Sequence, residues 1–600
     1  MIRVADYIAD YIYKLGVKEV FMVSGGGMMF LSDGIASHPR LKAVCNHHEQ
    51  ASAMAAESYA KYNGNIGVAY TTTGCGSTNA ITGVLGAWQD NVPCLFVSGQ
   101  SKRKETISNS GLALRQFGVQ EADIVPIVRS ITKYAEMVNV PEEIAYHLDR
   151  SIHLATTGRQ GPVWLDIPLD VQGALIDAKK LKRFDPKGPA TGYKTEPTDS
   201  EARSVKDSLL KAKRPVFLAG GGIRSSKAIK GFIELAERTG VPVVASRLGK
   251  GLLPTGHPLF IGMIGNKGER AGNFALQNSD LIIAVGSRLS VSSTGHEYKT
   301  FGREAKIIVV DIDPVEHKKN TVRIDRFVNA DAGSFIKALS DIGRLNIDEW
   351  ANRCQYWKRK WPVFQPAYKN DKKGINTYFF IETLSGLLKN NSVVIADAGS
   401  TSYVVAQGIS LKKDQRYITS SAQGEMGYTV PACIGVCFAK GRTEVLGITG
   451  DGSLQMNIQE LQTIKHHKLP IKLFVWNNNG YQSIRATQRK FFNGRLIGTD
   501  ARSGVSFPST KKIADAYNIR YFAMNKAGET ASLTKKIMKL DEPVICEVRC
   551  ETDQDVIPSV SSCTKDDGTM VSKPLEDMYP FLSRDEFKRE MIVKPLPKNK

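Results

Sequence analysis

The stretch EVLGITGDGSLQMNIQEL, residues 444–461, decides the fold. Its apolar start, Glu444–Thr449, is typical of a buried parallel strand, and Gly450-Asp451-Gly452-Ser453 leads into a helical pattern. Glycines let the backbone approach a ligand closely, and the free N–H groups of a new helix attract an anion. Asp451 between two glycines suits a hard divalent cation. An ordinary turn at the end of a strand has the same pattern.

A second polar cluster follows the next expected strand. IKLFVW, residues 471–476, runs into Asn477-Asn478-Asn479-Gly480-Tyr481, and Asn478 lies 27 residues after Asp451. This spacing is typical of one strand–helix–strand excursion, which brings two carboxyl ends to the edge where open α/β sheets bind ligands. Asp451, the Asn478 amide and the Gly480 carbonyl are therefore predicted Mg²⁺ ligands, completed by diphosphate oxygens. The alternative is an Asn-rich turn.

Apolar β-branched runs alternate with helical patterns along the whole chain, which predicts an α/β protein with three doubly wound parallel-sheet domains. The expected domains are 1–175, 202–345 and 373–552, with linkers at 176–201 and 346–372 and a tail at 553–600. The expected strands are Glu19–Val23, Ile66–Thr71, Cys94–Ser98 and Val163–Ile167; Val216–Ala219, Val243–Ala245, Leu281–Val285 and Ile307–Asp311; and Val393–Ala396, Glu444–Thr449, Ile471–Trp476 and Val544–Val548. A further short strand is expected to end near His48.

Composition excludes several classes of protein. With 600 residues, 42% hydrophobic and 23% charged, the chain is neither disordered nor a small disulfide scaffold. We expect no membrane span, because no run of about 18 apolar residues occurs, and no export signal, because Asp6 and Asp10 interrupt the start. The net charge of +20 is scattered, so a basic enzyme is favoured over a nucleic-acid partner. Nine cysteines without a CxxC pair indicate buried free thiols in a reducing cytoplasm.

The GDG and NN pair resembles the thiamin diphosphate motif of the thiamin-dependent enzymes, particularly the acetolactate synthase and pyruvate oxidase group. The resemblance covers nearly the whole chain. It implies a pyrimidine-binding domain, a central Rossmann-like domain and a diphosphate-binding domain, in that order. It also implies thiamin diphosphate and Mg²⁺ as cofactors, bound between two chains of a homodimer or homotetramer.

The resemblance implies roles for individual residues. Glu49, in HEQ at a strand-to-helix turn, would hydrogen-bond the aminopyrimidine N1′ and drive its amino group toward the imino form that deprotonates the reactive carbon. Gly26 would face that carbon, Gln120 would line the site, and Met426 in GEMG would hold the cofactor bent. The other cofactor-binding residues implied are Gly25, Gly74, Asn79, Gln100, Gly399, Ser400, Thr401, Gly424, Gly450, Gly452, Ser453, Asn478 and Tyr481.

The central domain matches the flavin-binding domain of this family only in part. Gly220, Gly221, Gly222, Arg288 and Asp311 stand where a dinucleotide would lie. Flavin-binding synthases usually have acidic residues and a second Arg where this chain reads LSVS, residues 289–292. Three alternatives stay open: FAD, an ADP-like ligand, and a domain that has lost its flavin.

The implied reaction is decarboxylation of a 2-oxo acid, most simply pyruvate, followed by transfer to an acceptor. The acceptor stays open among a second 2-oxo acid, a proton, a flavin and a keto sugar. Thr487 stands where synthases carry Trp, and Gln482 where they carry Gly. The tail resembles synthase-like proteins from surface-polysaccharide gene sets, where a nucleotide-linked keto sugar would be the acceptor. A rival hypothesis from another class is a basic nucleotide- or nucleic-acid-binding protein.

Overall fold

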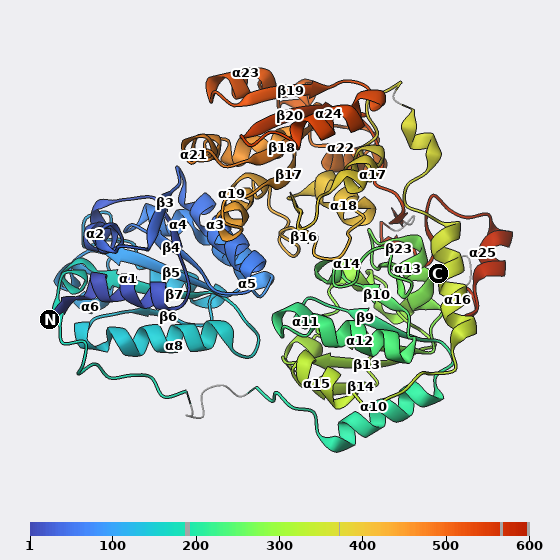
Figure 1. Ribbon diagram of the computed structural model, residues 1–600, viewed down its shortest axis with the longest axis horizontal. Coiled ribbons are helices and arrows are strands. Elements are labelled where there is room, and N and C mark those ends of the chain that lie inside the picture. Colours follow the sequence, from blue (N-terminus) through green and yellow to red (C-terminus); the bar gives the residue numbers. More distant parts are fainter. Residues whose placement is uncertain (187–192, 371, 565–567, 597–600) are drawn as a thin grey trace.

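The computed structural model describes residues 1–186, 193–370, 372–564 and 568–596. The expected linkers and tail therefore include residues that lie outside the described ones, namely 187–192, 371, 565–567 and 597–600. Three lobes follow one another along the chain and meet near the middle of the molecule (Figure 1). Each lobe contains one six-stranded parallel sheet, so the predicted fold class is confirmed.

The first sheet has apolar layers on both faces. Its strands, in spatial order, are β3 (Lys42–Cys45), β2 (Glu19–Met22), β4 (Gly67–Thr71), β5 (Cys94–Gln100), β7 (Val163–Pro168) and β6 (Ala135–Met137). The helices α3 (Glu49–Asn63) and α5 (Ile81–Gln89) cover one face, and α1 (Val4–Lys14), α2 (Met29–Ser37) and α8 (Ile144–Thr156) cover the other. The short strands β1 (Ile2–Arg3) and β8 (Leu175–Ile176) pair with each other and hold the two ends of this unit together.

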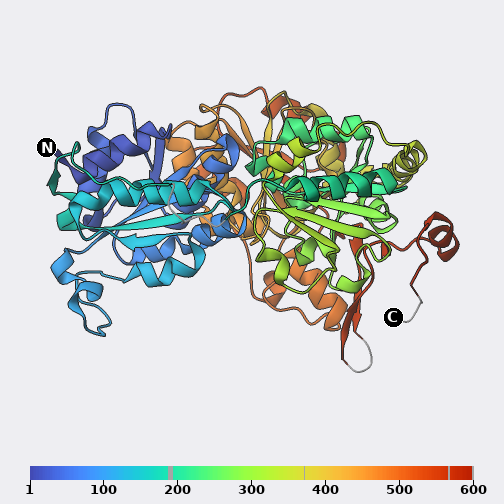
Figure 2. The same ribbon diagram turned by 90° about the horizontal axis from the view of Figure 1, so that it is seen from below.

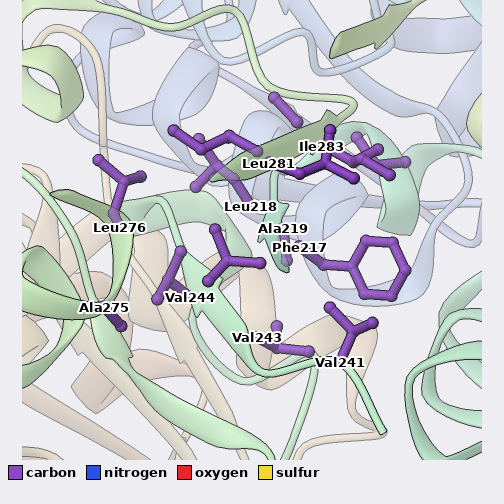
Figure 3. Close-up of a cluster of buried hydrophobic side chains, with 14 of the residues drawn as sticks. Phe217, Leu218, Ala219, Val241, Val243, Val244, Ala275, Leu276, Leu281 and Ile283 are labelled. Carbon is purple, nitrogen blue, oxygen red and sulfur yellow. The ribbon is translucent and has the colours of Figure 1, made fainter. Parts of the chain in front are cut away.

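The inner strands of the central sheet are almost wholly buried, whereas the edge strand β14 (Arg326–Asn329) is mostly half-buried. In spatial order the strands of this sheet are β11 (Phe260–Met263), β10 (Val243–Ala245), β9 (Pro215–Ala219), β12 (Leu281–Val285), β13 (Lys306–Asp311) and β14. Its helices are α10 (Asp199–Lys211), α12 (Ile229–Thr239), α13 (Arg270–Gln277), α15 (Ala332–Ala338) and α16 (Asp348–Lys360). Figure 3 shows the side chains of β9, β10 and β12 packed into one apolar cluster with α13. Strands buried on both faces explain why these segments read as continuous apolar runs.

The third sheet repeats the order of the first. Its strands are β16 (Arg416–Ile418), β15 (Val393–Ala396), β17 (Val445–Gly450), β18 (Ile471–Asn477), β20 (Val544–Arg549) and β19 (Arg520–Met524). Its helices are α17 (Thr377–Leu387), α18 (Gly399–Gly408), α19 (Thr429–Ala439), α21 (Glu460–His466), α22 (Gln482–Phe491), α23 (Thr510–Ala516) and α24 (Thr530–Ile537). Counted within each sheet, the first and third run 2-1-3-4-6-5, and the central one runs 3-2-1-4-5-6, the order of dinucleotide-binding folds.

The first and third lobes share one core through α3 and α19, which lie side by side (Figure 1). A Cβ atom on Gly435 of α19 would stand 2.0 Å from the carbonyl oxygen of Ala55 in α3, so only glycine allows this approach. The two helices are therefore in backbone contact. This contact fixes the first sheet relative to the third.

The twelve expected strands are the four inner strands of each sheet. The sequence does not predict the outer strands β6, β11, β14, β16 and β19, and β3 ends at Cys45 rather than near His48. These strands have only three to five residues and a sheet partner on one side. Four of the missed strands, β6, β14, β16 and β19, contain a charged residue, and Gly262 interrupts β11, so none reads as a continuous apolar run.

The tail covers the central lobe, as expected of a surface segment (Figures 1 and 2). Two short antiparallel pairs, β21 (Ser559–Val560) with β24 (Met578–Tyr579) and β22 (Ser562–Thr564) with β23 (Met570–Ser572), precede α25 (Arg584–Glu590). The buried Glu576 carboxylate pairs with Arg303 at 2.7 Å. The buried Glu590 carboxylate pairs with Lys360 at 2.6 Å.

None of the described helices is both long and apolar enough to span a bilayer. The nine cysteines are free thiols in the described structure. Six of them are buried as expected, and the other three, Cys45, Cys75 and Cys563, are exposed.

Candidate active site

The carboxylate of Asp451 lies at the carboxyl end of β17, beside the turn that follows the neighbouring strand β18. It accepts the backbone N–H of Gly452 at 2.8 Å and that of Gly480 at 3.2 Å. Burial raises the pKa of Asp451 to about 6, against the lowering effect of these hydrogen bonds. The structure therefore brings together the Gly450–Gly452 motif and the Asn-rich turn after β18, which are separated in the sequence by one strand–helix–strand unit.

The side-chain oxygen Oδ1 of Asn478 is buried and has no hydrogen-bond partner among the described residues. A buried acceptor without a partner costs about 1–3 kcal/mol, so it requires an explanation. A divalent cation bound to the neighbouring carboxylate would satisfy it, because carboxylate and amide oxygens are typical ligands of Mg²⁺. The Gly480 carbonyl, the third predicted ligand, accepts a hydrogen bond from the Gln482 N–H at 3.1 Å.

Arg485 in α22 stabilises the turn formed by residues 478–480. Its guanidinium donates to the Asn478 carbonyl at 3.2 Å and the Asn479 carbonyl at 3.3 Å, and it pairs with Asp553 at 3.0 Å. Arg485 is buried, 1% exposed. The sequence does not single out Arg485, because its only signal is a basic residue in the helix that follows the 478–480 turn.

Asp397, at the carboxyl end of β15, joins three loops. One carboxylate oxygen accepts the Ala398 N–H at 2.7 Å, and the other accepts the hydroxyls of Thr449 at 2.9 Å and Ser453 at 2.5 Å. The Ser453 hydroxyl oxygen in turn accepts the N–H of Gly427 at 2.8 Å. The loops 397–401, 424–427 and 450–453 are therefore fixed to one another by a single buried carboxylate.

Two of the hydroxyls among the implied cofactor-binding residues are turned inward. Thr401 donates to Asp397 Oδ1 at 3.0 Å and to the Ala398 carbonyl at 2.6 Å, and Ser453 bonds Asp397. These short-range side-chain bonds compete with ligand binding. The Ser400 hydroxyl has no protein partner in the described part of the chain, so it is the one left to meet a phosphate.

Glycines make room around this cleft. A Cβ on Gly452 would stand 2.2 Å from the ring of Tyr481, so glycine lets that ring cover the turn. Gly399 and Gly424 have φ values of 57° and 63°, which favour glycine, and the Cβ positions of Gly424 and Gly450 face open space. Met426 lies half-buried next to this loop.

Glu49 begins α3 in the first lobe, where the His48 side chain caps the helix. Glu49 is 8% exposed, and its Oε2 accepts a hydrogen bond from Asn79 Nδ2 at 3.0 Å. A Cβ on Gly76 would stand 3.1 Å from Oε1, so this glycine keeps the second oxygen accessible. The structure therefore joins two predicted residues, Glu49 and Asn79.

The glycine loop 25–27 follows β2 and packs on the loop that follows β4. A Cβ on Gly25 would stand 2.5 Å from Thr72, and one on Gly27 would stand 1.9 Å from Thr73 Oγ1, whereas Gly26 faces open space. The Gly74 turn likewise leaves room for the backbone carbonyl of Gln120, which would stand 1.9 Å from a Cβ there. The strands β2 and β4 flank the point where strand order reverses, the usual ligand position in such sheets.

Gln100 does not present a free side chain to this site. It is 1% exposed, and its amide donates to the Ala122 carbonyl and to Asp166 Oδ2, both at 3.0 Å. Burial raises the pKa of Asp166 to about 7. Gln100 thus positions the 120–122 segment from inside the lobe, whereas Gln120 itself is exposed.

A cavity of about 510 Å³ lies at the carboxyl ends of β9, β12 and β13, between all three lobes. Gly221, Gly222, Arg288 and Asp311 line it. Gly220 has an internal role, because a Cβ there would stand 2.0 Å from the Gly286 carbonyl oxygen. The predicted nucleotide residues therefore gather at one cavity, with Gly220 as part of the sheet packing.

Family models match all three lobes. Residues 2–127 match the thiamine pyrophosphate enzyme N-terminal TPP binding domain, 202–339 the central domain, and 397–548 the C-terminal TPP binding domain. The chain belongs to the thiamine pyrophosphate enzyme family. The cofactor of this thiamine pyrophosphate enzyme is thiamin diphosphate, as predicted.

Relatives of this thiamine pyrophosphate enzyme match it over nearly their whole length. A probable acetolactate synthase large subunit from Methanocaldococcus jannaschii is 32% identical, covering 91% of each chain. An acetolactate synthase large subunit from Corynebacterium glutamicum is 32% identical over 97% of this chain and 92% of its own. One from Lactococcus lactis is 31% identical over 93% of this chain and 94% of its own. The chain is therefore similar to acetolactate synthases in all three lobes.

Proposed function

We propose that this enzyme decarboxylates a 2-oxo acid, in the simplest case pyruvate, and joins the remaining two-carbon unit to a carbonyl acceptor. The bond between pyruvate C1 and C2 breaks and carbon dioxide leaves. A new carbon–carbon bond forms between C2 and the carbonyl carbon of the acceptor, whose oxygen takes up a proton. No oxidant or reductant is needed. The similarity to acetolactate synthases supports this class of reaction.

The observation that carries the proposal is the unpartnered Asn478 Oδ1 beside the Asp451 carboxylate. Together with the Gly480 carbonyl, these oxygens would hold Mg²⁺, and the Mg²⁺ would hold the diphosphate. The open space at Gly424 and Gly450 leaves room for phosphate oxygens near these ligands. Asp397 keeps the loops 397–401, 424–427 and 450–453 in register and would act as a positioning residue.

Glu49 would share a proton with the aminopyrimidine ring, and Asn79 would hold its carboxylate in place for that contact. When bound, thiamin diphosphate supplies a sink for the electron pair that decarboxylation leaves behind. The packed Gly25–Gly27 and Gly74 loops would exclude water from this side, and Gly26 alone would leave room for the substrate.

The site would be completed by a second copy of the chain, so we propose a homodimer as the smallest active unit. In the described residues no hydrogen bond or glycine contact of Glu49 reaches Asp451 or Asn478. Large exposed apolar side chains lie near both parts of the site. They are Leu112, Phe117 and Val119 close in sequence to Gln120, and Ile484, Phe492 and Ile497 in and after α22. Exposed apolar groups at these positions indicate an interface.

Two acceptors have structural support. A second pyruvate, giving acetolactate, is favoured by the named relatives. A keto sugar is favoured by α22, where the side chain of Thr487 is short and exposed and bonds back to the Ser483 carbonyl at 3.0 Å. A simple decarboxylase, with a proton as acceptor, is the third alternative.

The cavity of the central lobe has FAD and an ADP-like nucleotide as candidate occupants. Arg288 donates to the Gln89 carbonyl at 3.2 Å and has no ion pair in the described structure, so its charge is available to a phosphate. The visible absorption of purified protein tests for FAD, because only FAD carries a flavin. A protein without flavin absorption has either an ADP-like ligand or a domain that has lost its flavin.

The proposed reaction is tested by carbon dioxide release from pyruvate in the presence of thiamin diphosphate and Mg²⁺. We expect release that requires both cofactors and is lost in Glu49→Gln. Identifying the product formed with pyruvate alone, with added 2-oxobutyrate and with a keto sugar then assigns the acceptor. Full carbon dioxide release by Glu49→Gln would contradict the proposal.

A further inference from the structure

A second cavity, of about 560 Å³, lies between the cofactor loops of the third lobe and the central lobe. Its volume is in the range of small-molecule sites, roughly 300–1,000 Å³. One wall is formed by 397–399 and 421–424, and the other by 266–267 and 288–292. Asp451, Asn478 and Gly480 do not line it, and it shares Arg247, Arg288, Ser290 and Ser292 with the lining of the first cavity.

The cavity walls carry cationic side chains that form no ion pair among the described residues, although the Asp555 carboxylate acts on Lys267 at longer range. Arg247 and Lys267 contact the ring of Tyr403 at 4.9 Å and 6.0 Å, and neither has an ion pair among the described side chains. Arg288 lines the same cavity. Asp397, the one carboxylate in the lining, is already hydrogen-bonded through both oxygens. Partly buried cations without an ion-pair partner favour the binding of an anion.

Unpartnered acceptors lie beside these cations. Asn266 Oδ1 and Gln423 Oε1 are buried and have no hydrogen-bond partner in the described structure. A phosphate cannot satisfy them, because its oxygens also act mainly as acceptors. Hydroxyl groups can donate to them. The lining therefore calls for a ligand that carries both an anionic group and hydroxyl groups.

The tail closes the cavity from the outside. Val560, Ser562 and Ser572 line it, and the Val560 N–H donates to the Asn266 carbonyl at 2.9 Å. The hydroxyls of Ser562 and Ser572 lie 2.7 Å apart and add further hydrogen-bonding groups at the rim. The polar tail pairs β21–β24 and β22–β23 therefore form part of a binding site in addition to covering the surface.

We propose that this cavity binds a phosphorylated sugar, with its phosphate on Arg247, Lys267 and Arg288 and its hydroxyls on Asn266 and Gln423. Its use as the acceptor subsite rests on the proposed carboligase function, because the cavity adjoins the loops at Gly399 and Gly424. A second pyruvate has no hydroxyl group for the two amide oxygens. The phosphorylated keto sugar is therefore the acceptor class that this lining favours.

The test is calorimetric titration of the holoenzyme, saturated with thiamin diphosphate and Mg²⁺, with fructose 6-phosphate, fructose and inorganic phosphate. We expect fructose 6-phosphate to bind at least roughly tenfold more tightly than either of the others. Arg247→Gln and Lys267→Gln should each weaken it about tenfold. Lys230→Gln, which removes an exposed cation far from the cavity, should leave the affinity unchanged.

Several results would overturn the proposal: no binding of fructose 6-phosphate, equally tight binding of fructose or inorganic phosphate, or full affinity in both variants. Purified protein that carries flavin and binds the sugar phosphate only after flavin removal would also overturn it. Thermal unfolding of each variant shows whether it is folded. Carbon dioxide release from pyruvate without sugar is measured in the same preparation. Absence of carbon dioxide release with intact binding of the sugar phosphate contradicts only the proposed reaction. Normal carbon dioxide release without binding of the sugar phosphate contradicts only this inference.

Discussion

The amide Nδ2 of Asn79 donates a hydrogen bond of 3.0 Å to Oε2 of Glu49. The two residues lie 30 positions apart: Glu49 is the first residue of α3, and Asn79 is the last residue of α4 (Cys75–Asn79). The bond holds one carboxylate oxygen and leaves the other, next to Gly76, accessible. Asn79 therefore determines which oxygen of Glu49 is presented to a ligand.

Replacing Asn79 by Leu should lower kcat for carbon dioxide release while KM for pyruvate changes little. A hydrogen bond to a charged group contributes about 1.5–3 kcal/mol, which corresponds to roughly ten- to hundredfold in rate. Steady-state kinetics measure both constants, and titration checks that thiamin diphosphate still binds. A rise in KM with kcat unchanged would assign Asn79 to substrate binding instead.

Magnesium binding should weaken as the pH falls below 6. Burial raises the pKa of Asp451 to about 6, so the metal-free carboxyl carries a proton below that pH and must release it to bind the cation. The affinity should therefore fall about tenfold per pH unit below 6 and level off above it. Because this carboxyl pKa is raised, the metal-free fold is also less stable above pH 6 than below it. In Asp451→Asn the carboxyl is gone, and any remaining pH dependence of metal binding comes from the titration of the cofactor itself, so this variant is the matched control. Calorimetry at several pH values measures the difference in magnesium affinity between the two proteins.

Glu49→Gln and Asp451→Asn should each be inactive alone and active when produced together. If one site takes Glu49 from one chain and Asp451 from its partner, each mixed dimer contains one intact site. Random pairing then restores about a quarter of the wild-type activity. Assays on co-expressed, differently tagged chains measure this. Absence of any restored activity in purified mixed dimers would show that both residues come from the same chain.

Gly435→Ala should destabilise the protein, since its Cβ would overlap the Ala55 carbonyl between α19 and α3. Overpacking of this kind costs about 1–3 kcal/mol in the free energy of unfolding. Gly386→Ala in α17 is the matched control, because nothing lies within 4 Å of its Cβ position. That change should stabilise by about 0.5–1 kcal/mol. Denaturant unfolding of both variants tests the helix contact, and equal stabilities would contradict it.

The inner strands could be predicted because they are buried on both faces and read as apolar runs. Leu281–Val285 and Val243–Ala245 have the bounds expected of them. Outer strands such as Arg416–Ile418 and Arg520–Met524 begin with a charged residue and pair on one side, so their sequences resemble loops. Sequence periodicity reports burial, and therefore it identifies the interior of a sheet better than its edges.

In the candidate site, too, only residues that a local sequence pattern marks could be predicted. Asp451 and Asn478 stand out in the sequence because each directly follows a strand. Asp397 acts through Thr449 and Ser453, 52 and 56 residues further along the chain, and no local pattern reveals such a contact. Thr401 is one of the implied cofactor-binding residues, and the structure shows its hydroxyl bonded to Asp397.

Titration of metal-free protein with thiamin diphosphate tests the central claim most directly. We predict binding that requires Mg²⁺ and is weakened at least roughly tenfold by Asn478→Leu, which keeps the side-chain volume and removes the unpartnered oxygen. Binding of the same strength without Mg²⁺, or unchanged in Asn478→Leu, would contradict the account.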